Sequence, residues 1–193
     1  MKQERTSKDS PLVFGLTGQN ASGKGEVAKA LGSLGFAYFS LSDILREEAA
    51  ARGIDPIREN MVALGTELRA QFGEAVLADR IRDKLPPRAV VDSVRHPAEV
   101  ESLKDLPKFF LVHVSAPLSV RHSRSLRRGR PGDGTTLEAF SKQDKVEKAG
   151  SKAAPQLEAC ARLADREIVN DGLLKDLEDK VKSIVEDCDA GQK

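Results

Sequence analysis

The sequence is poor in several residue types, and each scarcity excludes a class of function. Its 193 residues include no tryptophan and one tyrosine, Tyr38, so few rings are available for stacking on single-stranded nucleic-acid bases. The 31 basic and 30 acidic residues nearly cancel, so no overall field steers the protein towards nucleic acid or a membrane. We therefore expect neither of these as a partner.

Cysteines and long apolar runs are also scarce. Cys160 and Cys188 form no metal-ligand pattern and are interpreted as buried thiols of a cytoplasmic protein, with a disulfide left open by the sequence. No apolar run approaches the roughly 20 residues that a membrane span needs. Residues 1–10 mix charges without an apolar core, which predicts a disordered tail rather than a signal peptide. Residues 11–193 are expected to form one domain.

The chain does contain an alternation of short apolar runs and helical patterns. Five runs are predicted to be buried strands: Pro11–Thr17, Phe36–Leu41, Ala89–Asp92, Phe109–Ser115 and Glu167–Asn170. A closing helix is expected to bury an inner stripe of Leu174, Leu177, Val181, Ile184 and Cys188. Short buried strands that alternate with helices predict an α/β fold, with a five-stranded parallel sheet covered by helices on both faces.

A glycine-rich turn follows the first predicted strand. Gly18-x-x-x-x-Gly23-Lys24 lies between a strand and a helix, the context in which this spacing cradles phosphate. The glycines let backbone N–H groups face phosphate oxygens, and the lysine reaches the outer phosphates. A plain tight turn would not require that lysine. The motif predicts ATP binding by Gly18, Asn20, Ala21, Ser22, Gly23, Lys24, Gly25 and Glu26.

The loop resembles that of adenylate-kinase-like enzymes, which carry Gly-Lys-Gly where many other P-loop proteins carry Gly-Lys-Ser or Gly-Lys-Thr. Gly25 is a normal variant within this resemblance. Glu26 departs from it, since the family usually has Thr there. A carboxylate beside the α-phosphate repels it unless the side chain turns away or helps to hold Mg²⁺ through water. Glu26 is thus the position that separates a working kinase from a protein that only binds.

Ser40–Glu48 resembles the GDxxR segment of nucleoside-monophosphate kinases. In those enzymes the Asp caps a helix and the Arg grips the phosphate of the acceptor. The resemblance assigns these roles to Asp43 and Arg46. A plain capped helix with a solvated arginine predicts the same string and stays open as the alternative.

Val90–Glu101 carries a second acceptor-like pattern. A predicted strand delivers Asp92 to its carboxyl end, where the carboxylate can hold Mg²⁺ through water or orient the acceptor, and Arg95 can clamp a phosphate. The segment resembles the DGxR segment of archaeal and bacterial adenylate-kinase-related proteins, with Ser93 in place of Gly. The alternative is an aspartate that only caps the next helix. His96 is interpreted as a solvated loop residue rather than a general base.

Five arginines fall within ten residues at the start of Arg121–Asp133. Three of them are expected on one helical face, and Gly129–Thr136 predicts a flexible loop. A solvated basic face is the alternative. The kinase family has a short arginine-rich lid with an RxRxxD-like core, which closes over the triphosphate. The resemblance implies a mobile lid at about residues 127–137, with catalytic Arg128 and Arg130 and a supporting Arg124.

Ala161–Gly172 resembles the ADxxIxNDG ending of dephospho-CoA kinases and their relatives, which implies that Asn170 and Gly172 lie beside the adenine. The matches run in order from Val13 to about Val185. Together they imply a P-loop NTPase fold of the nucleotide-kinase kind and transfer of a phosphoryl group from ATP, with Mg²⁺, to a small nucleotide-like acceptor. The implied catalytic residues are Lys24, Asp92, Arg128 and Arg130.

Two alternatives to a nucleoside-monophosphate kinase remain. The ending and the short lid also suit dephospho-CoA kinase. Asp144–Asp171 resembles the P-loop domain that precedes the deaminase domain of some bacterial deoxycytidylate deaminases. The chain has no zinc-deaminase signature, so this resemblance implies a nucleotide sensor that binds without turnover. The acceptor and the oligomeric state are not predicted from the sequence.

Overall fold

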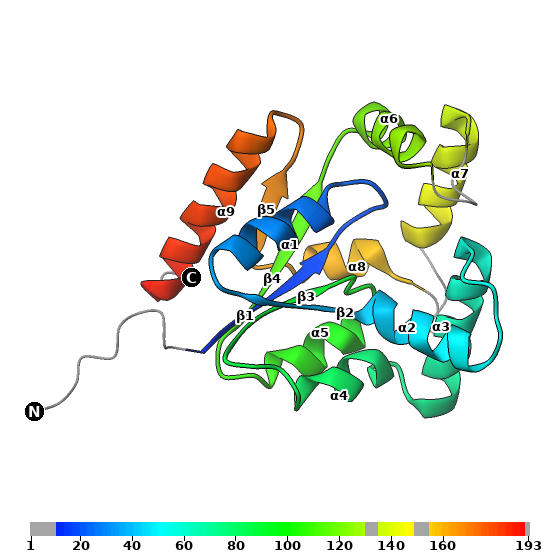
Figure 1. Cartoon of the computed structure of the whole chain (residues 1–193), viewed down its shortest axis with the longest axis horizontal. Coiled ribbons are helices and arrows are strands. Elements are labelled where there is room, and N and C mark those ends of the chain that lie inside the picture. The colour runs from blue at the N-terminus through cyan, green and yellow to red at the C-terminus, as the bar shows by residue number, and fades with distance from the viewer. Residues whose placement is uncertain (1–10, 130–134, 149–154, 192–193) are drawn as a thin grey trace, which may run out of the picture.

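The structure, a computed structural model, describes residues 11–129, 135–148 and 155–191. Residues 1–10, for which a tail is predicted, lie outside this part, as do Arg130 and the middle of the expected lid. The described elements build an α/β fold around a single parallel sheet (Figure 1).

The sheet has five strands in the order β2-β3-β1-β4-β5, and every neighbouring pair is parallel. The strands are β1 (Leu12–Thr17), β2 (Ala37–Ser40), β3 (Arg88–Asp92), β4 (Phe109–Ser115) and β5 (Arg166–Val169). All six residues of the central β1 are buried, as expected where helices cover both faces of a parallel sheet. The predicted fold class is therefore confirmed.

Two hydrophobic clusters lie on opposite faces of the sheet. On one face α1 (Lys24–Ser33) and α9 (Leu174–Asp189) pack over Phe14 and its neighbours. The other cluster contains residues of α2, α3, α4, α5 and α8. Those helices are Leu41–Ala51, Arg58–Phe72, Val76–Arg82, Pro97–Lys104 and Leu157–Arg162.

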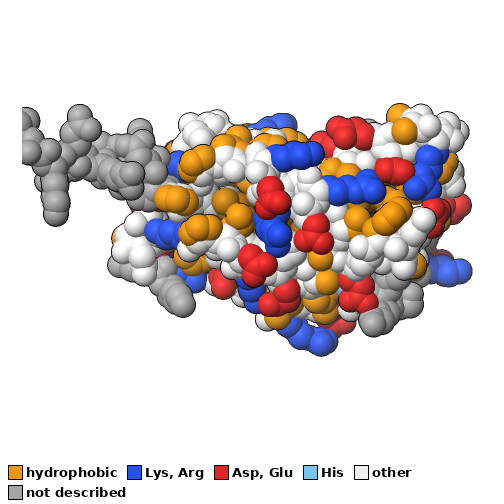
Figure 2. Space-filling model, turned by 90° about the horizontal axis from the view of Figure 1, so that it is seen from below, with side chains coloured by type: hydrophobic (Ala, Val, Ile, Leu, Met, Phe, Trp, Pro, Cys, Tyr) orange, Lys and Arg blue, Asp and Glu red, His pale blue; other side chains and the backbone are white. Residues whose placement is uncertain are grey.

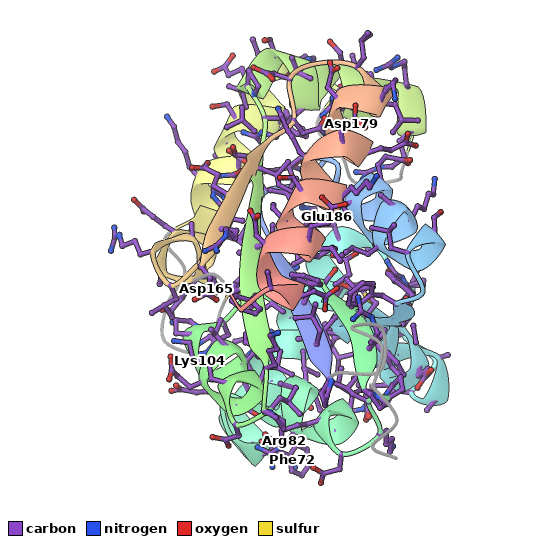
Figure 3. All side chains as sticks on the ribbon, turned by 90° about the vertical axis from the view of Figure 1, so that its left-hand side faces the viewer. Phe72, Arg82, Lys104, Asp165, Asp179 and Glu186 are labelled. Carbon is purple, nitrogen blue, oxygen red and sulfur yellow. The ribbon has the colours of Figure 1, made fainter. Side chains whose placement is uncertain are left out.

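The closing helix α9 buries Leu177, Val181, Val185 and Cys188. The predicted stripe is wrong at two positions: Leu174 is 55% exposed, and Ile184 is only partly buried, with Val185 taking the inner position. Leu174 follows the exposed Leu173 at the start of α9, and Leu177 is the first residue of the helix that is buried. Figure 3 shows Asp179 and Glu186 on the outer side of the helix, where they pair with lysines one turn away.

Both cysteines are buried and unbonded, which confirms the prediction of buried thiols. Burial raises the pKa of the Cys160 thiol to about 12 and also raises the pKa of Cys188. Neither thiol is therefore ionised near neutral pH.

The carboxyl ends of the strands share one edge, and open parallel sheets build their sites at this edge. In Figure 1 the strand arrows point towards α2, α3, α6 (Leu118–Arg128) and α7 (Leu137–Lys148), which gather beyond that edge. The face at the bottom of that view carries interspersed acidic and basic side chains (Figure 2), in keeping with the near-zero net charge. Among the described helices, none is long and apolar enough to cross a bilayer.

Candidate phosphoryl-transfer site

The turn between β1 and α1 has a backbone that only glycine permits at two positions. Gly18 and Gly23 have φ of +141° and +102°, in the left-handed region. A Cβ at Gly18 would collide with the carbonyl oxygen of Val114, and one at Gly23 with the side-chain amide of Asn170. The two glycines of the motif are thus required by a positive φ and by close packing together.

Gly25 differs from these two glycines. A Cβ there would meet nothing within 4 Å, and the residue lies in the first turn of α1. The backbone therefore does not demand glycine at the position where many P-loops carry Ser or Thr. The hydroxyl that this chain lacks could be accommodated sterically.

The ammonium of Lys24 lies inside the curve of the loop. Its Nζ donates to the carbonyl oxygens of Gly18 at 2.8 Å and Gln19 at 3.0 Å. The hydroxyl of Ser22 is fully buried and has no hydrogen-bond partner among the described residues. The loop thus presents a cation, a helix N-terminus and backbone amides at one point, the arrangement that binds phosphate oxygens.

Glu26 points along α1 rather than into the loop. Its carboxylate pairs with Lys29 Nζ at 2.8 Å, and the side chain is 45% exposed. An exposed pair of this kind contributes little stability. The pair does direct the carboxylate of Glu26 along the helix towards Lys29 and away from the loop. Of the two arrangements expected for Glu26, turning away or helping to hold Mg²⁺, the structure has the first.

Three arginines of α6 lie on one face, as their spacing predicts, and that face contacts the loop. Arg124 Nη1 donates to the carbonyl oxygens of Ser22 at 3.3 Å and Asn170 at 3.1 Å, and Arg128 Nη2 donates to Asn20 Oδ1 at 2.9 Å. Arg121 is 3% exposed and forms a bidentate pair with Asp144 of α7 at 2.7 and 2.9 Å. The alternative of a solvated basic face is wrong for Arg121, which is buried, and for Arg124, which is half-buried, whereas Arg128 stays exposed although it contacts the loop.

Asn170 connects the end of β5 to the loop. Its Nδ2 donates to the Ser22 carbonyl oxygen at 2.9 Å, and its Oδ1 accepts from Arg124 Nη2 at 3.3 Å. Gly172 follows in the turn that leads to α9. Of the two adenine-side residues predicted from the chain's ending, Asn170 therefore contacts the loop, and the role of both residues towards a base stays a prediction.

Asp92 ends β3, in register with Ser40 of β2, and is 9% exposed. Its Oδ1 accepts from the Ser93 amide at 2.6 Å, and its Oδ2 accepts from the Tyr38 hydroxyl at 3.4 Å. Burial and the neighbouring Asp92 carboxylate raise the pKa of the Tyr38 phenol. Sequence reasoning gave Tyr38 no part in this site.

The oxygen ligands at the strand edge are compatible with a magnesium ion that is held through water. No group of three or more His, Cys, Asp or Glu side chains within the described ranges could hold a metal by itself. Mg²⁺ keeps several waters and is commonly held by one or two carboxylates together with substrate phosphates. One carboxylate, that of Asp92, stands at the strand edge beside the loop, so it would hold the ion through water.

Ser93 has a φ of +67°, a conformation that glycine adopts freely and serine adopts at a cost. The DGxR motif that this segment resembles has glycine at this position. The departure is therefore a residue under backbone strain directly after Asp92.

The loop after β3 is held by Glu99, whose side chain is fully buried. Glu99 Oε2 accepts from the amides of Arg95 at 2.8 Å and His96 at 3.1 Å, while Oε1 pairs with Arg69 at 2.7 Å. The interpretation of His96 as solvated is wrong: it is 2% exposed, and its Nδ1 accepts from the Ala98 amide and caps α5. The sequence signal was His-Pro-x-Glu, a capping-box pattern with an unusual first residue.

One cavity of about 680 Å³ extends from the loop to α2 and α3. The predicted acceptor residues Asp43, Arg46 and Arg95 all line it, together with Asn20 and Arg128. Its remaining arginines, which sequence reasoning missed, are Arg58 and Arg69. The lining therefore carries five arginines against two carboxylates, which suits an anionic ligand.

The predicted cap of α2 is wrong. The helix begins at Leu41, with Ser40 at the cap position, so Asp43 lies in the first turn and pairs with Arg46 instead. The first turn is favourable for a carboxylate because of the helix dipole. The pair also keeps the arginine at the rim of the cavity.

Comparisons with known proteins agree with this fold. Residues 17–141 match the family model described as an AAA domain. A UPF0200 protein from Hyperthermus butylicus is 35% identical over 178 residues, which cover 90% of this chain and 93% of that relative. A shikimate kinase from Acinetobacter baumannii, solved with shikimate, has a TM-score of 0.58 at 15% identity and covers 94% of this chain and 97% of its own. A gluconokinase from Sinorhizobium meliloti has a TM-score of 0.56 at 16% identity and 94% and 95% coverage. These likenesses show a P-loop kinase fold.

Proposed function

The chain belongs to the UPF0200 family, and we propose that it is an ATP-dependent phosphotransferase whose acceptor is a small nucleotide-like molecule. The observation that carries this proposal is the continuous cavity that runs from Asn20 and Arg128 to Arg46 and Arg95. Its volume, about 680 Å³, is within the range of small-molecule sites. Phosphoryl transfer requires donor and acceptor to meet in one such enclosure, since positioning supplies most of the catalysis.

The donor end would be the loop. Lys24 and the amides at the start of α1 would bind the β- and γ-phosphates of ATP. The base would lie towards Asn170 and Gly172, where the side chain of Leu173 is 74% exposed and offers an apolar surface. Glu26, paired with Lys29, is turned along the helix, which supports a loop that can accept a triphosphate.

In the proposed reaction an oxygen of the acceptor bonds to the γ-phosphorus, the bond to the β–γ bridging oxygen breaks, and that oxygen leaves with ADP. Arg124 and Arg128, already in contact with the loop, would stabilise the charge on the transferring group, as would Arg130. Bound Mg²⁺ would neutralise charge on the phosphates, and Asp92 would hold its water shell in place.

The acceptor end favours a phosphate. Arg46, Arg58 and Arg95 line it, and guanidinium groups bind phosphate in a bidentate manner. A phosphate oxygen is already ionised near neutral pH, because the second pKa of a phosphate ester is about 6. Such an acceptor needs no general base, in keeping with His96 being used as a helix cap.

The test is ADP release from ATP and Mg²⁺ in the presence of a panel of ribo- and deoxynucleoside monophosphates and of dephospho-CoA. We expect one class of acceptor to stimulate release strongly, and Lys24→Ala to abolish the stimulation. Lys175→Ala, an exposed lysine on α9, is the matched control and should behave as the wild type.

Two results would contradict the proposal. Tight ATP binding without turnover for any acceptor would favour the nucleotide sensor. Unchanged ATP binding in Lys24→Ala would remove the loop from the donor site.

A further inference from the structure

Tyr38 stands between two neighbouring cavities. The acceptor cavity lies on one side, and a second cavity of about 530 Å³ lies on the other, between α2 and α4. Tyr38 and Asp43 line both. Elsewhere the two cavities are lined by opposite faces of α2, with Leu45 and Arg46 on one and Ile44 and Glu48 on the other, so the helix separates them. Tyr38 and Asp43 form the partition only at the amino end of α2, where the cavities adjoin.

Both side chains of the partition are held in place. The hydroxyl of Tyr38 donates to Asp92 Oδ2 at 3.4 Å, and Asp43 pairs with Arg46. In the register of β2 and β3, Tyr38 lies opposite Val90, two residues before Asp92, so both point to the same face of the sheet. The residue is 51% exposed, although its hydroxyl donates to Asp92.

The second cavity is not a rival site for the anionic end of an acceptor. Three carboxylates line it, those of Asp43, Glu47 and Glu48. Glu48 is paired with Arg80 at 3.0 Å and with Arg52 at 2.7 Å, and the rest of the lining includes apolar side chains such as Phe39, Ile44 and Ile81. A ligand that used both cavities would need a phosphate among the arginines and an uncharged arm that passes Tyr38.

We propose that Tyr38 orients Asp92 and closes the acceptor cavity, so that the enzyme accepts compact mononucleotides and rejects acceptors with a long chain beyond the phosphate. This inference rests on the proposed function and selects among its acceptors. To enter the second cavity, a long acceptor would have to displace the ring and break both the contact with Asp92 and the pair between Asp43 and Arg46.

Two substitutions separate the roles of Tyr38. Tyr38→Phe keeps the ring and removes the hydroxyl, so it should leave acceptor affinity unchanged and lower kcat roughly three- to tenfold, the value of one lost hydrogen bond. Tyr38→Ala also removes the partition. It should strengthen the binding of a long acceptor, relative to that of the compact acceptor, by roughly tenfold or more.

The experiment measures binding by calorimetry and turnover by ADP release, with the nucleoside monophosphate panel as compact probes and dephospho-CoA as the long probe. A second variant, Tyr38→Ala with Ala51→Phe, refills the second cavity from α2 and should reverse the gain for dephospho-CoA. Thermal unfolding of each variant controls for folding. Because Tyr38 is the only tyrosine and tryptophan is absent, its fluorescence in the wild type should also change when a compact acceptor binds.

The outcomes are distinguishable. A wild-type preference for dephospho-CoA, or an unchanged preference in Tyr38→Ala, would overturn the role of Tyr38 and leave the phosphotransferase intact. An equal loss of kcat and affinity in Tyr38→Phe would reduce its role to structural support. If no probe binds to the wild type, the proposed function fails as well.

Discussion

The proposed donor end and the proposed acceptor end are built in different ways. The proposed donor end is one contiguous loop, Gly18 to Lys24, which reaches the cavity at Asn20 and whose form depends on glycines with positive φ. The acceptor end is assembled from α2, α3 and the loop after β3, and the fully buried Glu99 holds that loop in place. One end is thus specified by local backbone geometry, and the other by a buried charge network.

The largest expected effect comes from removing the network. Glu99→Ala leaves the charge of Arg69 buried without its partner, so we expect it to lower the free energy of unfolding by about 3–5 kcal/mol, measured by urea denaturation. Glu101→Ala, on the same helix but exposed, should change it by less than about 0.5 kcal/mol. A similar small change in both variants would contradict the account of the acceptor end.

The donor end offers a matched pair of glycines. Gly23→Ala places a Cβ against Asn170 at a positive φ, whereas Gly25→Ala meets open space. We expect the first to cost about 1–3 kcal/mol of stability and to weaken ATP binding at least tenfold. The second should be tolerated in both respects. Thermal unfolding and ATP titration check this, and equal effects would mean that the loop geometry does not require Gly23.

Ser93, directly after Asp92, has a strained backbone with a positive φ. Ser93→Gly should raise the free energy of unfolding by up to about 1 kcal/mol, because glycine adopts this φ without strain. The gain is limited by the greater freedom of glycine in the unfolded chain. A loss of stability on urea denaturation would show that the serine side chain contributes contacts that outweigh the strain.

The smallest expected effect is that of the Cys160 thiol on stability near neutral pH. Burial raises its pKa to about 12, so folding favours the protonated thiol. The contribution of this thiol to the free energy of unfolding is fully present below about pH 8.5, the pKa of a cysteine in an unfolded chain. That contribution is lost as the pH rises from there towards the pKa of the folded protein. At pH 8 we expect both thiols to react with a disulfide reagent only as fast as the protein opens. Rapid labelling of the native protein would contradict the burial of these groups.

The same contrast explains what could be predicted from the sequence. The strands and the loop were predictable because each depends on residues that are adjacent in the chain. Glu99, Arg69 and Tyr38 were not, since their roles depend on contacts across 30 or more positions. His96 was misread for a related reason: its burial follows from the packing of α5 and from its cap, and a lone histidine beside a proline carries little of that information.

For α9 the sequence predicted the helical spacing of the buried residues correctly. It did not fix which of two adjacent residues faces the core, and Val185 rather than Ile184 does so. The arginines of α6 were assigned to one face correctly because helical spacing alone fixes it. Arg58 was missed because only the fold brings the first turn of α3 to the cavity.

The central claim is that donor and acceptor meet in one cavity. The most direct test is acceptor-stimulated ADP release, measured with ATP affinity in Lys24→Ala and Arg95→Ala. We predict that Lys24→Ala loses stimulated release, and that Arg95→Ala keeps wild-type ATP affinity while its acceptor KM rises by an order of magnitude or more, as expected for a lost charged hydrogen bond. Acceptor KM unchanged in Arg95→Ala, with stimulated release intact, would contradict the claim.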